Sequence, residues 1–171
     1  QHLLTMSCGI HENTYSDLFV QDNWVKAFLK QSFPHEPGTF YRYSTHCSHM
    51  LSAIITKVSG LSLEQFLNRY LFYPMEIYEA QWELSPEKLT AGGMGLSLYP
   101  MSLVKIAQLL LKEGSYNGSQ LISKEYLKMA VTQQIIKQDD INNPDSEFSG
   151  NGYGYQFHIG KDGYYRMDGG F

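Results

Sequence analysis

A tyrosine and a threonine stand where a loop of this chain passes into a helix. Residues 37–45 combine a proline-glycine turn with a short extended run, and a helical pattern follows over residues 46–58. Loop–helix junctions can hold polar side chains rigidly at the mouth of a cleft. Tyr43 is therefore a candidate general base, provided that a neighbouring cation favours its phenolate. The same local sequence also fits a tyrosine that only packs beside the helix that follows.

Two other residue patterns could do chemistry. His46 and His49 are three apart, so they could share a helix face and bind a metal ion. No third ligand follows at an obvious spacing, and we expect ordinary polar positions at a helix start instead. Serine-x-x-lysine strings occur at residues 85–88 and 102–105. We interpret both serines as helix caps, since Pro86 suits the first helical position and Ser102 begins a helical pattern.

Apolar periodicity predicts the helices that must position these residues, over residues 22–31, 46–58, 62–74, 102–112 and 123–133. Ser62 with Gln65 has the spacing of a capping box, and Ser123 is a second cap. The expected apolar faces are Val25, Phe28 and Leu29; Cys47, Met50, Ile54 and Val58; and Leu103, Ile106, Ala107, Leu110 and Leu111. On this reading Cys47 is a buried thiol, not the disulfide partner of Cys8.

Turn-forming residues separate the helices. Residues 91–95 hold three glycines and could cradle a ligand, although they carry no phosphate-binding fingerprint. Residues 135–150 are polar and are predicted to form an exposed loop. The alternating stretches 153–159 and 164–167, with a turn at 160–163, predict an antiparallel β-hairpin.

Composition limits the class of protein. The chain has 171 residues, 43% hydrophobic and 18% charged, which suits one compact domain. Its net charge of -4 gives no reason to expect nucleic acid as a partner, and no apolar stretch could span a bilayer. The chain starts within what reads as a helix at residues 1–6, so we expect an internal piece of a longer protein. Localisation and oligomeric state are not indicated.

The order of these segments resembles the serine β-lactamase-like hydrolases: class C β-lactamases, penicillin-binding D-alanyl-D-alanine peptidases, and related esterases and amide hydrolases. Order and spacing carry the resemblance more than any single motif does. The matching stretches are HLLTMSCG at 2–9, PGTF through YST at 37–45, FYPM at 72–75 with Trp82 beyond it, GGMGL through LLKEG at 92–114, and YGY at 153–155 with MDGG at 167–170.

The resemblance implies a mechanism. In the family, a serine of an S-x-x-K motif attacks an amide or ester carbonyl and forms an acyl-enzyme, while the lysine and a tyrosine manage the protons. Tyr43 takes the tyrosine position and Thr45 the position of an asparagine. Asp168, Gly169 and Gly170 fall where a K-T-G or H-x-G motif helps to bind substrate beside the oxyanion hole.

Three departures from the family pattern matter. The S-x-x-K motif should precede residue 2 and is absent, Thr45 supplies only a hydroxyl in place of a carboxamide, and Met167 replaces the lysine or histidine of the third motif. We therefore expect this piece to be inactive alone.

The resemblance implies an α/β (α+β) fold of the β-lactamase and DD-peptidase type. Residues 1–150 would form a helical region and residues 151–171 the first strands of the returning sheet, all within one partial domain. The full-length protein would be a serine hydrolase acting on a small-molecule amide, ester or peptide, without cofactor or metal. A non-catalytic relative that binds a peptide or cell-wall ligand is the alternative.

Overall fold

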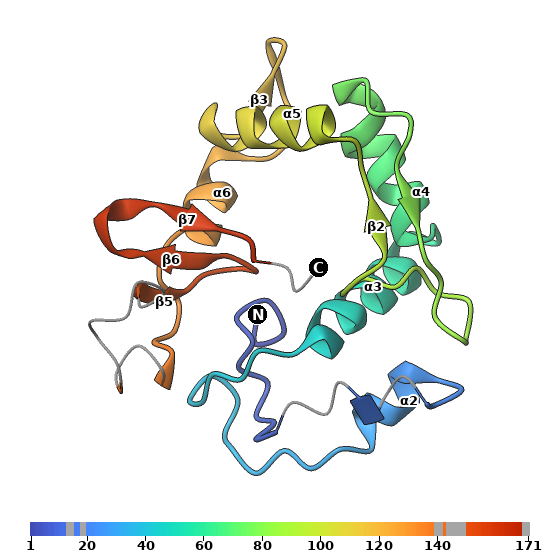
Figure 1. Ribbon diagram of the computed structural model, residues 1–171, viewed down its shortest axis with the longest axis vertical. Helices are drawn as coiled ribbons and strands as arrows, with labels where there is room; N and C mark the ends of the chain where they lie inside the picture. Colours follow the sequence, from blue (N-terminus) through green and yellow to red (C-terminus); the bar gives the residue numbers. More distant parts are fainter. Residues whose placement is uncertain (13–15, 18–19, 139–141, 143–149, 169–171) are drawn as a thin grey trace. The chain divides into compact units, whose positions relative to one another are not determined.

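The computed structural model describes residues 1–12, 16–17, 20–138, 142 and 150–168 (Figure 1). They divide into two compact units. Unit 1 contains Gln1–Asn13, Gln31–Ser44 and Lys128–Phe171, and unit 2 contains Thr14–Lys30 and Thr45–Leu127. Of the helices in the described part of the chain, none is long and apolar enough to cross a bilayer.

Unit 2 begins with a short helix, α2, over Trp24–Leu29. Asn23 caps it, because its side-chain oxygen accepts from the Lys26 N–H at 2.8 Å. Trp24 and Phe28, four residues apart, form its buried face. The sequence-based face of Val25, Phe28 and Leu29 is thus partly wrong, since Leu29 is exposed.

Helix α3 spans Thr45–Ser59, close to the predicted limits, and ends before Gly60, whose φ of 72° lies in the left-handed region. Cys47 and Met50 are buried as predicted, but Ile54 and Val58 are exposed. The apolar stripe was therefore right only for the first half of the helix. His46 and His49 are buried there as well, which corrects the expectation of ordinary polar positions.

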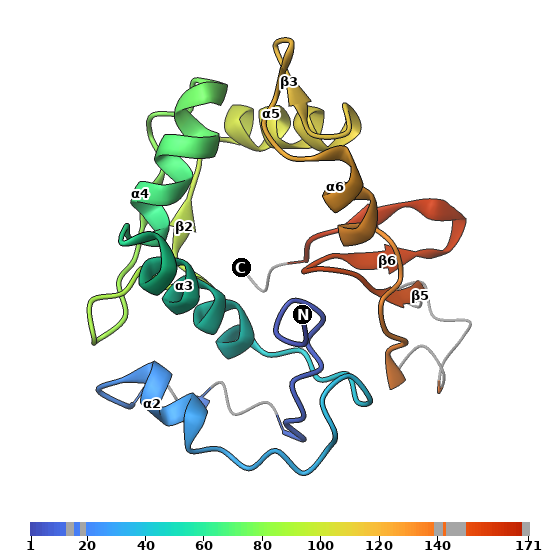
Figure 2. The same cartoon turned by 180° about the vertical axis from the view of Figure 1, so that it is seen from behind.

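Helix α4 (Leu63–Leu67) follows α3, as Figure 2 shows. The predicted capping box is present, with Ser62 and Gln65 satisfying each other's backbone N–H groups. Beyond α4 the chain widens into a π-helical turn, η1 (Asn68–Phe72), and closes with a 3₁₀ turn, η2 (Tyr73–Met75). Apolar side chains from these turns, from Ile77 just beyond them and from α5 form one core cluster of unit 2: Phe72, Met75, Ile77 and Leu109.

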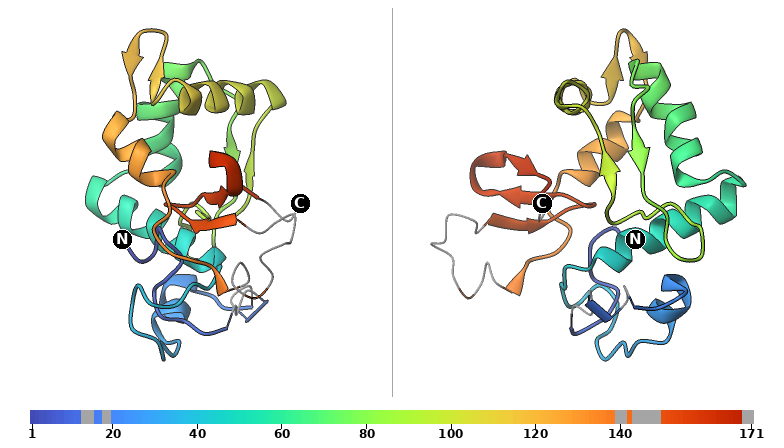
Figure 3. Two further views of the ribbon diagram at one scale, coloured as in Figure 1. Left: turned by 90° about the vertical axis from the view of Figure 1, so that its left-hand side faces the viewer. Right: turned by 45° about the vertical axis from the view of Figure 1, so that its right-hand side comes forward.

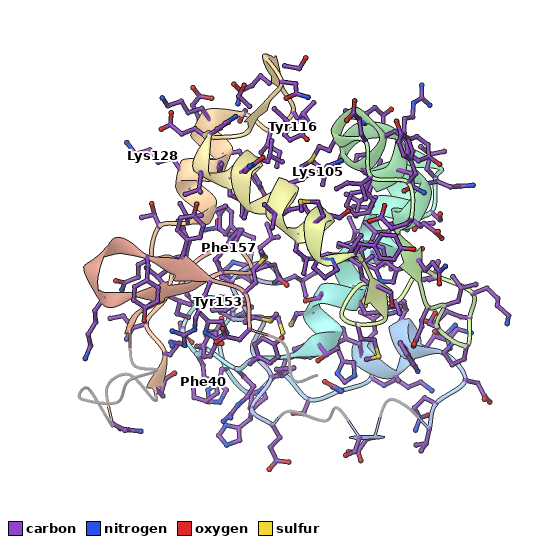
Figure 4. All side chains as sticks on the ribbon, turned by 45° about the horizontal axis from the view of Figure 1, so that its top comes forward. Phe40, Lys105, Tyr116, Lys128, Tyr153 and Phe157 are labelled. Atoms are coloured by element: carbon purple, nitrogen blue, oxygen red, sulfur yellow. The ribbon has the colours of Figure 1, made fainter. Side chains whose placement is uncertain are left out.

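Helix α5 spans Pro100–Leu111 and starts earlier than predicted, because Pro100 takes its first turn. Its buried residues are Ser102 and Leu109, seven apart, whereas Leu103 and Leu111 of the predicted face are exposed. The predicted face is therefore only partly right: Ile106 packs against the core cluster, but the most buried positions are Ser102 and Leu109. Lys105, labelled in Figure 4, donates from Nζ to the carbonyl oxygens of Met75 (3.0 Å) and Glu76 (2.8 Å).

Short strands complete unit 2. Strands β1 (Gln81–Trp82) and β2 (Leu96–Ser97) pair in antiparallel fashion, and Figure 3 shows this ribbon alongside α4. Strands β3 (Ser115–Tyr116) and β4 (Ser119–Gln120) form a tight hairpin across Asn117 and Gly118. Both turn residues have positive φ, as this kind of hairpin requires.

Helix α6 spans Lys124–Ala130 and ends before the predicted Gln133. The Ser123 cap is confirmed, because its Oγ accepts from the Tyr126 N–H at 3.1 Å. At the start of unit 1, residues 2–6 form turns where the sequence suggested a helix, and Met6 leaves the helical region with a φ of 54°.

Unit 1 carries a three-stranded antiparallel sheet in the order β5-β6-β7, drawn in red in Figure 1. The strands are β5 (Gly150–Tyr153), β6 (His158–Gly160) and β7 (Tyr165–Arg166). The 3₁₀ turn η3 (Lys161–Gly163) joins β6 to β7, so the predicted hairpin is confirmed. Most of the loop predicted at 135–150 lies outside the described residues.

One detail of the hairpin prediction was wrong. Residues 153–159 do not form a single strand, because Tyr153 ends β5 and a turn precedes β6. Gly154 donates its N–H to the carbonyl of Phe157 at 2.8 Å, and Gln156 has a φ of 65°. A Cβ on Gly154 would stand 2.1 Å from the carbonyl oxygen of Ala130, so this tight turn requires glycine.

Candidate active site

The segment that carries Tyr43 is fixed along the N-terminal residues of unit 1. Backbone hydrogen bonds join Gly38 N–H to the Ser7 carbonyl (2.8 Å) and Arg42 N–H to the Met6 carbonyl (2.8 Å). Next to it, the buried rings of Tyr41 and Tyr153 pack with centroids 5.2 Å apart. Backbone pairing and ring packing therefore hold the chain at residues 38–42, directly before Tyr43.

The N-terminal residues also bind the turn between β5 and β6. Gln156 donates its backbone N–H to the Leu4 carbonyl at 2.9 Å, and its side-chain amide donates to the carbonyls of Leu3 (3.2 Å) and Leu4 (3.1 Å). Phe157, labelled in Figure 4, lies at the end of the same turn. The segment with Tyr43 and the start of β6 are thus tied to one stretch of chain.

Tyr43 is 39% exposed, and its ring lies against His158 on β6. The two rings are close to parallel, at 23°, with centroids 6.2 Å apart. Nε2 of His158 is 3.9 Å from an oxygen of Asp168, and the side chain of His158 is only 16% exposed. The structure therefore brings together two predicted site residues, Tyr43 and Asp168, through a histidine that the sequence analysis did not select.

Asp168 is held by a neighbour on β7. Arg166 Nε donates to both carboxylate oxygens of Asp168, at 2.9 and 2.7 Å. The hydrogen bond to Asp168 raises the pKa of Arg166, so the guanidinium stays charged at any pH of interest. Met167 lies between the two and is exposed, while Gly169 and Gly170 fall outside the described residues.

Thr45 belongs to unit 2, where it begins α3 and contacts the glycine-rich loop. A Cβ on Gly93 would stand 2.3 Å from the Thr45 carbonyl oxygen, so residue 93 must be glycine for the loop to lie against the first turn of α3. Trp82 fixes the loop from its other side, because its indole N–H donates to the carbonyls of Ala91 and Met94, each at 2.8 Å. Gly93 therefore serves close packing against Thr45.

Replacing Gly93 with alanine is expected to destabilise the protein by about 2 kcal/mol, because the new methyl group displaces either the loop or the first turn of α3. Thermal unfolding of the variant measures the loss. Gly118→Ala is the matched control, since nothing lies within 4 Å of a Cβ there and only its positive φ is penalised, at about 1 kcal/mol. Equal losses in the two variants would contradict the steric explanation.

The two histidines of α3 form a buried cluster in unit 2. His46 and His49 are 4% and 2% exposed, and the indole of Trp24 meets His49 edge-on with centroids 5.2 Å apart. Nε2 of His49 lies 3.4 Å from Glu87 Oε1, which also accepts from the Val25 N–H at 3.0 Å. Within the described residues, no three His, Cys, Asp or Glu side chains are arranged to hold a metal ion.

Burial dominates the electrostatics of this cluster. It lowers the pKa of His46 to about 4, with a smaller contribution from His49. Burial also lowers the pKa of His49, against the opposing effect of Glu87. Although burial by itself raises the pKa of Glu87, hydrogen bonds from backbone N–H groups outweigh it and the pKa is lowered. Both imidazoles are therefore neutral at pH 7.

Neither serine-x-x-lysine string has the geometry of a nucleophile with its base. Ser85 is buried in a turn where its Oγ accepts from the Leu89 N–H at 3.2 Å, and no helix follows it as predicted. Ser102 lies inside the first turn of α5 and donates to the carboxylate of Glu79, so it does not cap the helix either. Its lysine, Lys105, is bound to backbone carbonyls.

Solved structures share this fold. A candidate 6-aminohexanoate-dimer hydrolase from Bacillus anthracis superposes with a TM-score of 0.78 at 18% identity, over 99% of this chain and 50% of that one. A penicillin-binding protein from Bacillus halodurans superposes with a TM-score of 0.68 at 17% identity, over 96% of this chain and 58% of that one. Simvastatin synthase from Aspergillus terreus superposes with a TM-score of 0.63 at 16% identity, over 90% of this chain and 50% of that one. The chain thus spans 50–58% of the length of these proteins.

Sequence comparison identifies the family. None of the curated protein sequences matches the chain significantly. The family model named Beta-lactamase, however, matches residues 1–171, which is the whole chain. The fold, the order of the motifs and this match agree with one another, and the chain belongs to the beta-lactamase family.

Proposed function

We propose that the full-length protein is a serine hydrolase that cleaves an amide or ester bond through an acyl-enzyme. Family membership and the motif order support this proposal. The observation that carries it is the placement of Tyr43, whose half-exposed ring stands beside His158 and Asp168 on a segment fixed by backbone hydrogen bonds.

The roles follow from the residue types. Tyr43 takes the proton of the nucleophilic serine as that serine attacks the carbonyl, and then passes the proton to the leaving group. The nucleophile comes from an S-x-x-K segment outside the 171 residues. Thr45 offers a hydroxyl for a hydrogen bond to the nucleophile's lysine or the substrate amide, and Asp168, Gly169 and Gly170 contact the substrate.

The direct test is to trap the intermediate. The full-length protein is incubated with a fluorescent penicillin or a short-chain nitrophenyl ester, and intact mass spectrometry looks for the acyl adduct. We expect an adduct that disappears when the serine of the S-x-x-K segment is replaced by alanine. Reversible binding of a peptide or cell-wall fragment without any adduct would favour a non-catalytic binding protein instead.

The 171 residues alone are expected to be inactive, because Ser85 and Ser102 are engaged in structural hydrogen bonds. The measurement is turnover of a chromogenic cephalosporin and a nitrophenyl ester by the purified chain. Turnover that co-purifies with the chain and is lost in Ser102→Ala would show that the nucleophile has been misplaced.

A further inference from the structure

A tyrosine acts as a base near neutral pH only if a positive charge close by stabilises its phenolate, since a phenol ordinarily has a pKa of about 10. We propose that His158 supplies this charge in unit 1 and is a positioning residue for Tyr43. The inference rests on the proposed function and names a residue that neither the motif pattern nor the comparisons assign.

The register of the sheet places His158 correctly for this role. His158 on β6 is paired with Arg166 on β7, and directly opposed residues of antiparallel strands point to the same face. Asp168 follows Arg166 by two residues and therefore returns to that face in extended chain, while Met167 points away. The sheet thus aligns Arg166, Asp168 and His158 on the side that faces Tyr43.

The contacts form a continuous chain from Arg166 to Tyr43. Arg166 binds Asp168 at 2.7 Å, Asp168 lies 3.9 Å from Nε2 of His158, and His158 lies parallel to the ring of Tyr43. Asp168 is therefore the carboxylate that would pair with a charged His158. Arg166 holds that carboxylate in place, because its Nε contacts both oxygens.

Packing holds the imidazole in place. Tyr153 meets it edge-on, with centroids 4.9 Å apart and rings at 89°, and Tyr153 is itself among the most deeply buried side chains. Ile159, the next residue on β6, is also buried. His158 is therefore constrained by the edge-on contact with Tyr153, while its ring remains parallel to Tyr43.

The chemistry assigns no proton transfer to His158. The proton of the nucleophilic serine moves to Tyr43 and then to the leaving group, so the proton balance closes without the imidazole. The imidazolium acts through its charge: it stabilises the phenolate before attack and the negative charge that remains on Tyr43 until the proton arrives. Removal of the charge should slow acylation less than removal of the phenol itself.

The test uses full-length His158→Gln and His158→Phe, the second of which keeps an aromatic ring against Tyr43 and Tyr153. We expect acylation by a nitrophenyl ester to slow on the order of tenfold at neutral pH in both. The pH–rate profile of the His158 variants should lack any ionisation that Asp168→Asn shifts in the parent. The titratable or charged groups facing His158 include Tyr43, Tyr153, Asp168 and Arg166. His2→Gln, at an exposed histidine of the same unit, is the matched control.

A double-mutant cycle separates this inference from the proposed function. If His158 acts through Tyr43, adding His158→Gln to Tyr43→Phe slows acylation no further. Absence of any acyl adduct in the parent protein would overturn the proposed function, whereas a normal acylation rate in Tyr43→Phe would overturn only the role of Tyr43 and this inference with it. A slow Tyr43→Phe would leave that function standing, and this inference alone would fail if His158→Phe acylated at the parental rate or if the two losses multiplied. A melting temperature for each variant shows whether it has folded.

Discussion

Full-length Tyr43→Phe is expected to form the acyl-enzyme on the order of a hundredfold more slowly than the parent protein, because loss of a general acid–base group typically has an effect of that size. The substitution keeps the ring that contacts His158 and removes only the hydroxyl. Burst kinetics with a nitrophenyl ester measure the acylation step separately from hydrolysis of the intermediate.

The control for this prediction is a tyrosine in the same segment. Tyr41, two residues earlier, is buried against Tyr153, so Tyr41→Phe removes the hydroxyl of a packed ring and leaves the phenol of Tyr43 intact. It should acylate close to the parental rate. If Tyr43→Phe also keeps the parental rate with an unchanged melting temperature, Tyr43 is a packing residue and the site assigned to unit 1 is wrong.

The second large effect is a loss of stability in acid. His46 has its pKa lowered from 6.5 to about 4 by burial, so the unfolded chain binds a proton more readily than the folded one between these values. The stability that depends on neutral His46 is therefore fully present above pH 6.5 and is lost as the pH drops toward 4. A shift of this size corresponds to a decrease of about 3 kcal/mol in the free energy of unfolding.

Two neighbouring groups, His49 and Glu87, add to this loss of stability in acid. The pKa of His49 is also lowered by burial, which adds to the loss as the pH falls below 6.5. Glu87, whose pKa is lowered as well, contributes stability above its unfolded pKa of about 4.5 that is lost at still lower pH. All three groups therefore destabilise the folded state in acid, with the histidines acting first.

Urea unfolding at several pH values measures the effect, with tryptophan fluorescence as the signal, since Trp24 contacts His49 directly. His46→Leu should flatten the dependence between pH 6.5 and 4 because the titrating group is gone. His46→Asn serves the same purpose if the leucine variant does not fold. The exposed histidine variant His2→Gln should keep the parental curve. A His46→Leu curve as steep as the parental one would place the acid sensitivity elsewhere.

Local sequence determined much of the secondary structure and the family. The capping residues Ser62 and Ser123 marked helix starts correctly, because a cap needs only its own side chain and the N–H groups two or three residues on. The order of the motifs was sufficient to identify the family, and the hairpin of β6 and β7 followed from alternation about a turn. Each of these signals lies within a short stretch of chain.

Tertiary structure decided which helix faces are buried. The sequence of α5 offers an apolar stripe that includes Leu103 and Leu111, yet the helix buries Ser102 and Leu109. Burial of the Ser102 hydroxyl is tolerated because the carboxylate of Glu79, 23 residues earlier in the chain, accepts its hydrogen bond. Similarly, His46 and His49 are buried in unit 2 among Trp24 and Glu87, which no helical periodicity could reveal.

In the candidate site, too, some residues could be predicted from the sequence and others only from the tertiary structure. Tyr43 and Asp168 could be selected from the sequence because they occupy motif positions. His158 could not, since it stands in an ordinary alternating strand. Its place beside Tyr43 depends on the β6–β7 register and on contacts that join residues more than a hundred positions apart. A sequence pattern records the spacing of residues along one segment, whereas the electrostatic environment of a side chain is set by whichever segments pack against it.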